Sequence, residues 1–132
     1  MNVVLDTNIL VSALINPAGV PATILSLLLN GRLTILYDNR ILGEYTEVLS
    51  RQKFHFKKNH ILHLLDYIRY GGDFVAVEPM RVRSVSEDDR MFYEVAVTGK
   101  AEFLVTGNKK HFPNENMIKT PKEFVDLYLS RK

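Results

Sequence analysis

Three carboxylates and one amide lie in the sequence where an α/β fold would bring them together. Two of these side chains follow short apolar runs with the character of buried strands, and the other two lie in helical segments. They are Asp6 and Asn108, and Glu44 and Asp89. Because open α/β sheets bind ligands at the carboxyl ends of their strands, we expect the four side chains to converge on one crevice.

The chemistry of this set points to a divalent cation. Carboxylates that share a crevice repel one another and lose hydration, so they need a compensating positive charge. The chain has no cysteine, and oxygen atoms dominate the expected ligands. Hard ions such as Mg²⁺ or Mn²⁺ suit oxygen ligands. Such an ion lowers the pKa of a bound water, neutralises a phosphate and aligns an attack on phosphorus.

Each position also has a plainer interpretation. Asp6 could cap the helix that follows it, and Glu44 could be an ordinary solvated carboxylate on a helix. Ser86 and Asp89 have the spacing of a capping box. Asn108 could simply be a turn residue. The residues taken one by one leave these alternatives open.

The elements that would position these side chains alternate between strands and helices. Continuous apolar runs predict strands that are covered on both faces, and helical periodicity with terminal caps predicts the helices. The expected caps include Asp38 or Asn39 before the third helix and a capping box of Thr120 and Glu123 before the last helix. The expected strands are 3–5, 33–37, 74–77, 102–106 and 117–118, and the expected helices are 8–15, 22–29, 39–49, 59–70, 86–99 and 121–128. We expect helix 22–29 to be well buried and residues 78–85 to form a polar connection. Together these elements predict an α/β fold, a three-layer αβα domain over residues 1–132 with a central, mainly parallel sheet of four to five strands.

Composition limits the remaining classes. At 132 residues with 46% hydrophobic side chains, the chain is long enough to bury a core as one domain. No apolar run approaches the roughly 20 residues that span a bilayer, so no membrane role is expected. The lack of cysteine fits a reducing cytoplasm. The formal net charge of +2 permits an anionic partner without requiring one.

Four segments of the chain resemble the PIN-domain nucleases. They are Leu5–Asn8, Gly43–Arg51, Glu87–Phe92 and Leu104–Asn108. The similarity runs from residue 1 to about residue 113. It is strongest toward a bacterial branch described as toxin components of toxin-antitoxin pairs.

This resemblance implies roles for individual residues. Asp6, Glu44 and Asp89 match the acidic positions that bind Mg²⁺ or Mn²⁺ and cleave single-stranded RNA in the family, and Asn108 stands at the fourth position. Asp88 adjoins Asp89 and is an alternative ligand. The residues implied as further polar contacts are Asn8 and Thr106. The resemblance also implies cleavage by metal-activated water, products with 5′-phosphate and 3′-hydroxyl ends, a small antitoxin protein as partner, and a homodimer.

Asn108 departs from the family pattern, which usually has aspartate there. Asparagine keeps one carbonyl oxygen but lacks the negative charge, so the metal should bind more weakly. Three functions therefore remain: a metal-dependent endoribonuclease that acts as a toxin, a weakened PIN-fold module that binds RNA or an antitoxin, and a nuclease outside toxin-antitoxin systems that processes RNA or recognises a particular nucleic-acid structure.

Basic residues could supply contacts to RNA phosphates. Lys109, Lys110 and His111 follow directly after Asn108, and residues 51–58 hold four positive charges and two phenylalanines. This basic segment could extend a phosphate track with a phenylalanine stacked on a base. The alternative is a solvated loop whose phenylalanines anchor it to the core.

Overall fold

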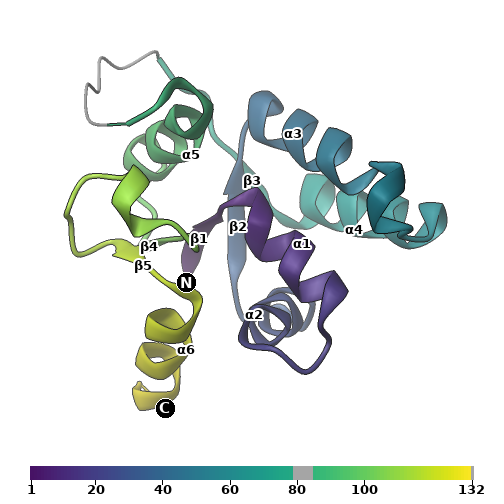
Figure 1. The fold of residues 1–132 in the computed structure, drawn as a ribbon. Coiled ribbons are helices and arrows are strands. Elements are labelled where there is room, and N and C mark those ends of the chain that lie inside the picture. Colours follow the sequence, from purple (N-terminus) through teal and green to yellow (C-terminus); the bar gives the residue numbers. More distant parts are fainter. Residues whose placement is uncertain (79–84, 132) are drawn as a thin grey trace.

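The computed structural model describes residues 1–78 and 85–131 (Figure 1). Within these residues the strands are β1 (Asn2–Leu5), β2 (Thr34–Tyr37), β3 (Asp73–Phe74), β4 (Phe103–Val105) and β5 (Ile118–Lys119). The α-helices are α1 (Thr7–Ile15), α2 (Val20–Leu29), α3 (Asn39–Leu49), α4 (Lys58–Gly71), α5 (Glu87–Thr98) and α6 (Pro121–Ser130). Two short 3-10 helices are η1 (Gln52–Phe54) and η2 (Lys109–His111). Most of the expected polar connection, residues 78–85, lies outside the described residues.

The strands form a single sheet in the order β3-β2-β1-β4-β5, and every neighbouring pair is parallel. At the centre, Val3 pairs with Ile35 of β2 and with Phe103 of β4. The three apolar residues of β1 are fully buried, as expected for a strand covered on both faces. The predicted fold class is confirmed. Because all strands point the same way, their carboxyl ends lie along one edge.

The path of the chain determines which helices cover which face. The chain moves outward from β1 through β2 to β3, and then crosses back over the sheet to β4. Right-handed crossovers in opposite directions place their helices on opposite faces. Figure 1 accordingly shows α5 on the other side of the sheet from α1 and α4. Helix α5 packs against β1, β2 and β4. This packing places the first turn of α5 at the edge of the sheet where the strands end.

The helix starts follow local sequence signals in two cases. The Asp38 carboxylate caps α3 by accepting a hydrogen bond from the Ile41 N–H at 3.0 Å. Thr120 and Glu123 form a complete capping box at the start of α6. Both caps were expected from the sequence. They fix the first turns of two helices that pack against the sheet.

Two details differ from the sequence expectation. Helix α2 is not well buried: its inner face, which includes Ile24 and Leu28, lies in the core, but Leu29 is 46% exposed. Strand β3 covers Asp73–Phe74 instead of 74–77, and both residues are exposed because β3 is an edge strand. Apolar composition alone does not reveal how many faces of an element are covered.

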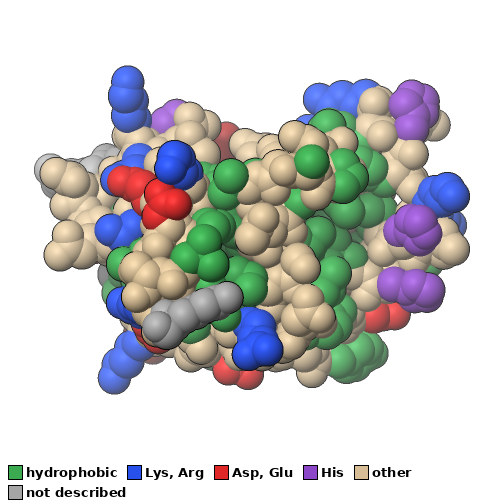
Figure 2. All heavy atoms as spheres, turned by 90° about the horizontal axis from the view of Figure 1, so that it is seen from below, with side chains coloured by type: hydrophobic (Ala, Val, Ile, Leu, Met, Phe, Trp, Pro, Cys, Tyr) green, Lys and Arg blue, Asp and Glu red, His purple; other side chains and the backbone are tan. Residues whose placement is uncertain are grey.

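Apolar side chains also gather on the outer surface. A groove of about 440 Å³ is lined by Leu14, Leu25, Leu29, His60, His63, Leu64 and Tyr67. In the view of Figure 2, hydrophobic side chains form a broad area with histidines toward one side. No single described helix is long and apolar enough to cross a membrane; one bent pair, α1 with α2 at 104°, meets the same criteria of length and composition.

Two glycines provide a matched test of this packing. A Cβ atom at Gly72 would lie 2.6 Å from the Ile68 carbonyl oxygen and 2.7 Å from the Ile35 carbonyl oxygen, whereas a Cβ at Gly43 would meet nothing within 4 Å. We expect Gly72→Ala to lower the free energy of unfolding by about 2 kcal/mol or more. Gly43→Ala, in the middle of α3, should raise it by about 0.5–1 kcal/mol. Urea unfolding of the two variants measures both. Equal effects of the two substitutions would contradict the close approach at Gly72.

Candidate active site

A cleft of about 360 Å³ opens at the carboxyl edge of the sheet. It is lined by Asp6, Thr7, Asn8, Glu44, Val48, Arg51, Ser86, Asp88, Asp89, Phe92, Asn108 and His111. The four side chains that were expected to converge, Asp6, Glu44, Asp89 and Asn108, all line this cleft. They come from the end of β1, the middle of α3, the first turn of α5 and the turn after β4.

Asp6 lies at the floor of the cleft and is only 7% exposed. Its carboxylate accepts a hydrogen bond of 2.8 Å from the Thr106 hydroxyl, which in turn accepts one of 3.0 Å from the Asn108 N–H. Asp6 occupies the N-cap of α1 but makes no capping hydrogen bond of normal geometry. Burial raises the pKa of Asp6, and the nearby charge of Asp89 adds to this effect, while the Thr106 hydroxyl partly offsets it.

Glu44 faces the cleft from α3. Its carboxylate accepts a short hydrogen bond from the Thr7 hydroxyl. Burial raises the pKa of Glu44, and the charges of Asp6, Asp89 and Asp88 raise it further, against the lowering effect of the Thr7 hydroxyl. The solvated carboxylate on this helix is Glu47, which is 61% exposed. The two glutamates on one helix therefore have different surroundings.

Asp89 approaches from the first turn of α5. The Ser86 hydroxyl donates to its carboxylate at 2.7 Å, and the Nδ1 atom of His111 lies 3.2 Å from it. The expected capping box at the start of α5 is wrong, because the Ser86 side chain makes no hydrogen bond to the helix backbone. Ser86 is directed to the Asp89 carboxylate instead. Asp88 lines the same cleft beside Asp89.

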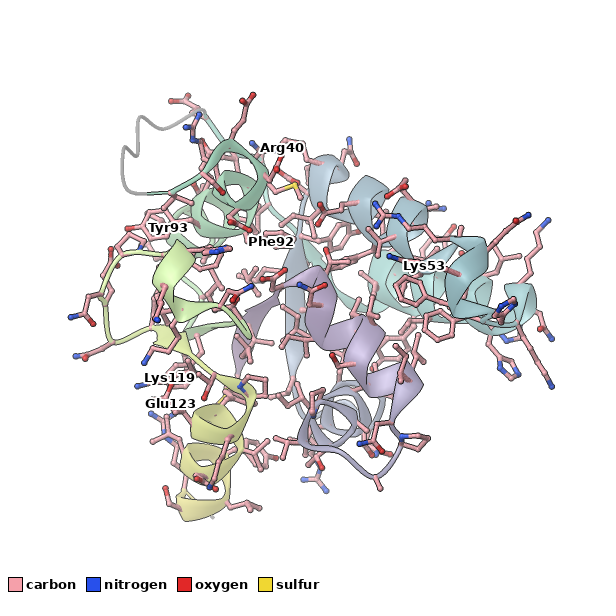
Figure 3. All side chains as sticks on the ribbon, viewed as in Figure 1. Arg40, Lys53, Phe92, Tyr93, Lys119 and Glu123 are labelled. Carbon is pink, nitrogen blue, oxygen red and sulfur yellow. The ribbon has the colours of Figure 1, made fainter. Side chains whose placement is uncertain are left out.

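Buried contacts hold α3 and α5 in place around the cleft. The Tyr45 hydroxyl donates to the Leu5 carbonyl oxygen at 2.5 Å. The Arg40 guanidinium bridges Asp38 and Glu94, with N–O distances of 2.7 Å to each, and Glu94 on α5 is 1% exposed. In Figure 3, Arg40 lies where α3 and α5 approach each other. These contacts fix Glu44 and Asp89 relative to the end of β1.

Comparison with known proteins places this arrangement in a family. A family model described as PIN domain matches residues 2–110. The chain belongs to the PIN domain family. Membership implies a nuclease-type function in general terms. An uncharacterized protein of Methanocaldococcus jannaschii is 33% identical over 145 aligned positions, which cover 97% of this chain and 92% of that protein. No solved structure gives a significant match.

PIN-domain nucleases generally use divalent metals, and the donors in this cleft suit such an ion. The carboxylates of Asp6, Glu44 and Asp89 and the amide oxygen of Asn108 form an all-oxygen set for Mg²⁺ or Mn²⁺. A cation would also relieve the repulsion that raises the pKa values of Asp6 and Glu44. Within residues 1–78 and 85–131, however, no three acidic or histidine side chains are already placed to hold a metal.

The basic residues of this PIN domain are placed differently from one another. Lys109 and Lys110 line a second cavity of about 240 Å³ instead of the cleft, and the Lys109 ammonium lies 3.1 Å from Glu123. Of the basic segment 51–58, Arg51 is the residue that lines the cleft. The sequence alone does not indicate which residue of the segment 51–58 lines the cleft.

The two phenylalanines of the basic segment are anchors for it. Phe54 and Phe56 stack on each other with centroids 5.3 Å apart, and both pack against the core. The Lys53 ammonium lies 5.1 Å from the centre of the Phe54 ring (Figure 3). These contacts favour the anchoring alternative over base stacking.

Sequence reasoning also missed the hydroxyl partners of the carboxylates. Thr7 binds Glu44, and Ser86 binds Asp89. The position of Thr7 directly after Asp6 was the available signal, since a hydroxyl beside a crevice residue can reach the same space. For Ser86 the signal was misleading, because the same spacing is typical of a capping box.

The raised pKa of Asp6 predicts how stability depends on pH without metal. A raised pKa means that the folded protein binds a proton more readily than the unfolded chain, so ionised Asp6 lowers stability. As pH rises above the ordinary value of 3.8, the wild type should lose stability relative to Asp6→Asn. The loss should be complete above the raised pKa. We therefore expect the variant to be the more stable protein at pH 7 in EDTA, and this advantage to disappear toward pH 3.

Denaturant unfolding across this pH range measures the difference. Asp126→Asn serves as the control, because Asp126 is an exposed carboxylate on α6, and it should change stability by less than about 0.5 kcal/mol. An Asp6→Asn variant that is less stable than wild type at pH 7 would show that Thr106 and the cleft favour the ionised carboxylate.

Proposed function

We propose that this PIN domain is a Mg²⁺- or Mn²⁺-dependent endoribonuclease that cleaves single-stranded RNA. The observation that carries the proposal is the shared cleft of Asp6, Glu44, Asp88 and Asp89, in which the pKa values of Asp6 and Glu44 are raised. Such a cluster costs folding free energy, which a purely structural role would not explain. Perturbed carboxylates in a cleft are typical of functional sites.

In this proposal Asp6, Glu44 and Asp89 hold the ion, and Asn108 contributes its carbonyl oxygen. A divalent ion held there would supply positive charge to the phosphate and would lower the pKa of a bound water. Thr106 orients Asp6 through its hydroxyl, and Asn108 orients Thr106 through its backbone N–H. Asn8 lines the cleft beside these groups and is available to the substrate. The support for these roles is the common placement of the side chains.

The proposed reaction is the hydrolysis of a phosphodiester bond of RNA by water. A water oxygen forms a bond to the scissile phosphorus while the bond from phosphorus to the 3′ oxygen breaks. One of the cleft carboxylates takes the proton of the water as a general base. The proton leaves with the 3′ oxygen, so the products carry a 5′-phosphate and a 3′-hydroxyl.

A second function is favoured by one observation of this structure. No group of three acidic or histidine side chains among the described residues is placed to hold a metal, and the fourth family position is the neutral Asn108. A module that binds RNA or an antitoxin without cutting would have these properties.

The biological role is proposed on the resemblance to toxin components. In that role the chain would be neutralised by a small antitoxin protein and would form a homodimer. The sequence similarity is the support for both partners.

Cleavage of single-stranded RNA distinguishes the two functions. We expect cutting that requires Mn²⁺ or Mg²⁺, and a loss of about 100-fold or more in Asp6→Asn, because a charged ligand of the ion is removed. Asn108→Asp should cut faster than wild type, since it adds a fourth charge. Thermal melts of each variant verify folding. If only Asn108→Asp cleaves RNA, the native chain is the binding module. If wild type cleaves RNA in the presence of EDTA, the reaction does not require a metal ion.

Metal binding can be measured without activity. An ion that binds only the folded protein stabilises it by about 2.7 kcal/mol at 100 times its Kd. We expect saturating Mn²⁺ to raise the free energy of unfolding of wild type and of Asp126→Asn, and to have little effect on Asp6→Asn. Equal stabilisation of all three proteins would mean that the ion binds elsewhere.

A further inference from the structure

The cleft presents an electrostatic problem to an RNA substrate. Asp6, Glu44, Asp88 and Asp89 line it, and RNA brings negative charge at every phosphate. A bound ion could neutralise charge on the scissile phosphate, but the carboxylates that line the cleft would still repel the neighbouring phosphates. A substrate that binds here therefore needs a cation at the rim of the cleft.

Arg51 is the residue with permanent positive charge among the described residues that line the cleft. It lies two residues beyond the end of α3 and seven residues after Glu44, and its side chain is 46% exposed. His111 also lines the cleft, but its Nδ1 atom lies 3.2 Å from the Asp89 carboxylate. Lys109 is paired with Glu123, and Lys53 lies over the Phe54 ring.

The local structure holds Arg51 in position. The Arg51 N–H donates to the Val48 carbonyl oxygen at 3.2 Å, and the following η1 turn is anchored to the core through the stacked pair of Phe54 and Phe56. The guanidinium donates to Glu47 from Nε at 3.1 Å and from Nη2 at 2.8 Å. Arginine has five N–H donors in a planar fork, so donors remain for a phosphate while Glu47 is bound.

We propose that Arg51 binds the RNA phosphate next to the scissile one and so determines how the strand lies across the cleft. This inference rests on the proposed function, and it assigns to Arg51 the phosphate contact that the sequence suggests more broadly for Lys109, Lys110 and the basic segment 51–58. Glu47 restrains the guanidinium but lies close enough to repel the same phosphate. The alternative is that Arg51 and Glu47 form an exposed pair on one helix, which contributes little by itself.

Removal of each partner separates these two cases. In an Asp6→Asn background, which keeps the RNA intact, fluorescence anisotropy measures binding of a single-stranded RNA oligonucleotide. Arg51→Gln should weaken binding about tenfold and reduce the slope of log Kd against log salt by about 0.7. Glu47→Gln should tighten binding about twofold, because a repulsive charge is lost. Lys122→Gln, an exposed lysine paired with Asp126, is the control for a general loss of charge and should leave both quantities unchanged.

Kinetics with Asp6 intact provide a second readout. Arg51→Gln should raise KM about tenfold and change kcat by less than about threefold, whereas Lys110→Gln should leave both unchanged. If Arg51→Gln and Glu47→Gln weaken binding equally, or if Arg51→Gln affects only kcat, the phosphate contact is overturned. If wild type never cuts but Arg51→Gln still weakens binding with the expected salt slope, the phosphate site stands and the nuclease activity fails.

Discussion

The hydrogen bond from the Tyr45 hydroxyl to the Leu5 carbonyl oxygen is the contact on which the site depends. Both residues are fully buried, and a buried hydroxyl without a partner would be costly. This bond therefore fixes the rotation of α3 over the end of β1. Because Glu44 precedes Tyr45 and Asp6 follows Leu5, the same bond brings the two carboxylates to one cleft. The bond between Thr7 and Glu44 follows from that placement.

The structure treats its buried carboxylates in two different ways. Asp38 and Glu94 both form ion pairs with the Arg40 guanidinium, which joins α3 to α5. Asp6 and Glu44 lie nearby, but their hydrogen-bond partners are the neutral hydroxyls of threonines. A hydroxyl group donates a hydrogen bond to a carboxylate but does not neutralise its charge. The carboxylates that join α3 to α5 are therefore paired with a cation, whereas Asp6 and Glu44 in the cleft have only neutral hydroxyl partners among their side-chain hydrogen bonds.

Local signals in the sequence predicted the fold well, because each one acts within a few residues. Continuous apolar runs predicted the parallel strands, and the caps at Asp38 and Thr120 predicted two helix starts. The same signals failed where contacts between residues far apart in the sequence determine the position of a side chain. The Ser86 hydroxyl binds a carboxylate on the rim of the cleft instead of the helix backbone. The contribution of Arg51 to the cleft depends on the turn after α3, which no periodicity encodes. The roles of the cleft residues stay predictions, although their convergence could be expected from strand ends alone.

Asn108 has two separate functions in this arrangement, and only one depends on its side chain. Its backbone N–H donates to the Thr106 hydroxyl, and that hydroxyl donates to Asp6. Any residue except proline could make the backbone contact at this position, so the replacement of aspartate by asparagine leaves the orientation of Asp6 unaffected. What changes is charge: an aspartate would add to the repulsion that already raises the pKa values of Asp6 and Glu44. Without metal, the neutral Asn108 side chain reduces the repulsion among the cleft carboxylates and so reduces its cost in folding stability. The missing negative charge also weakens the attraction of the cleft for a cation.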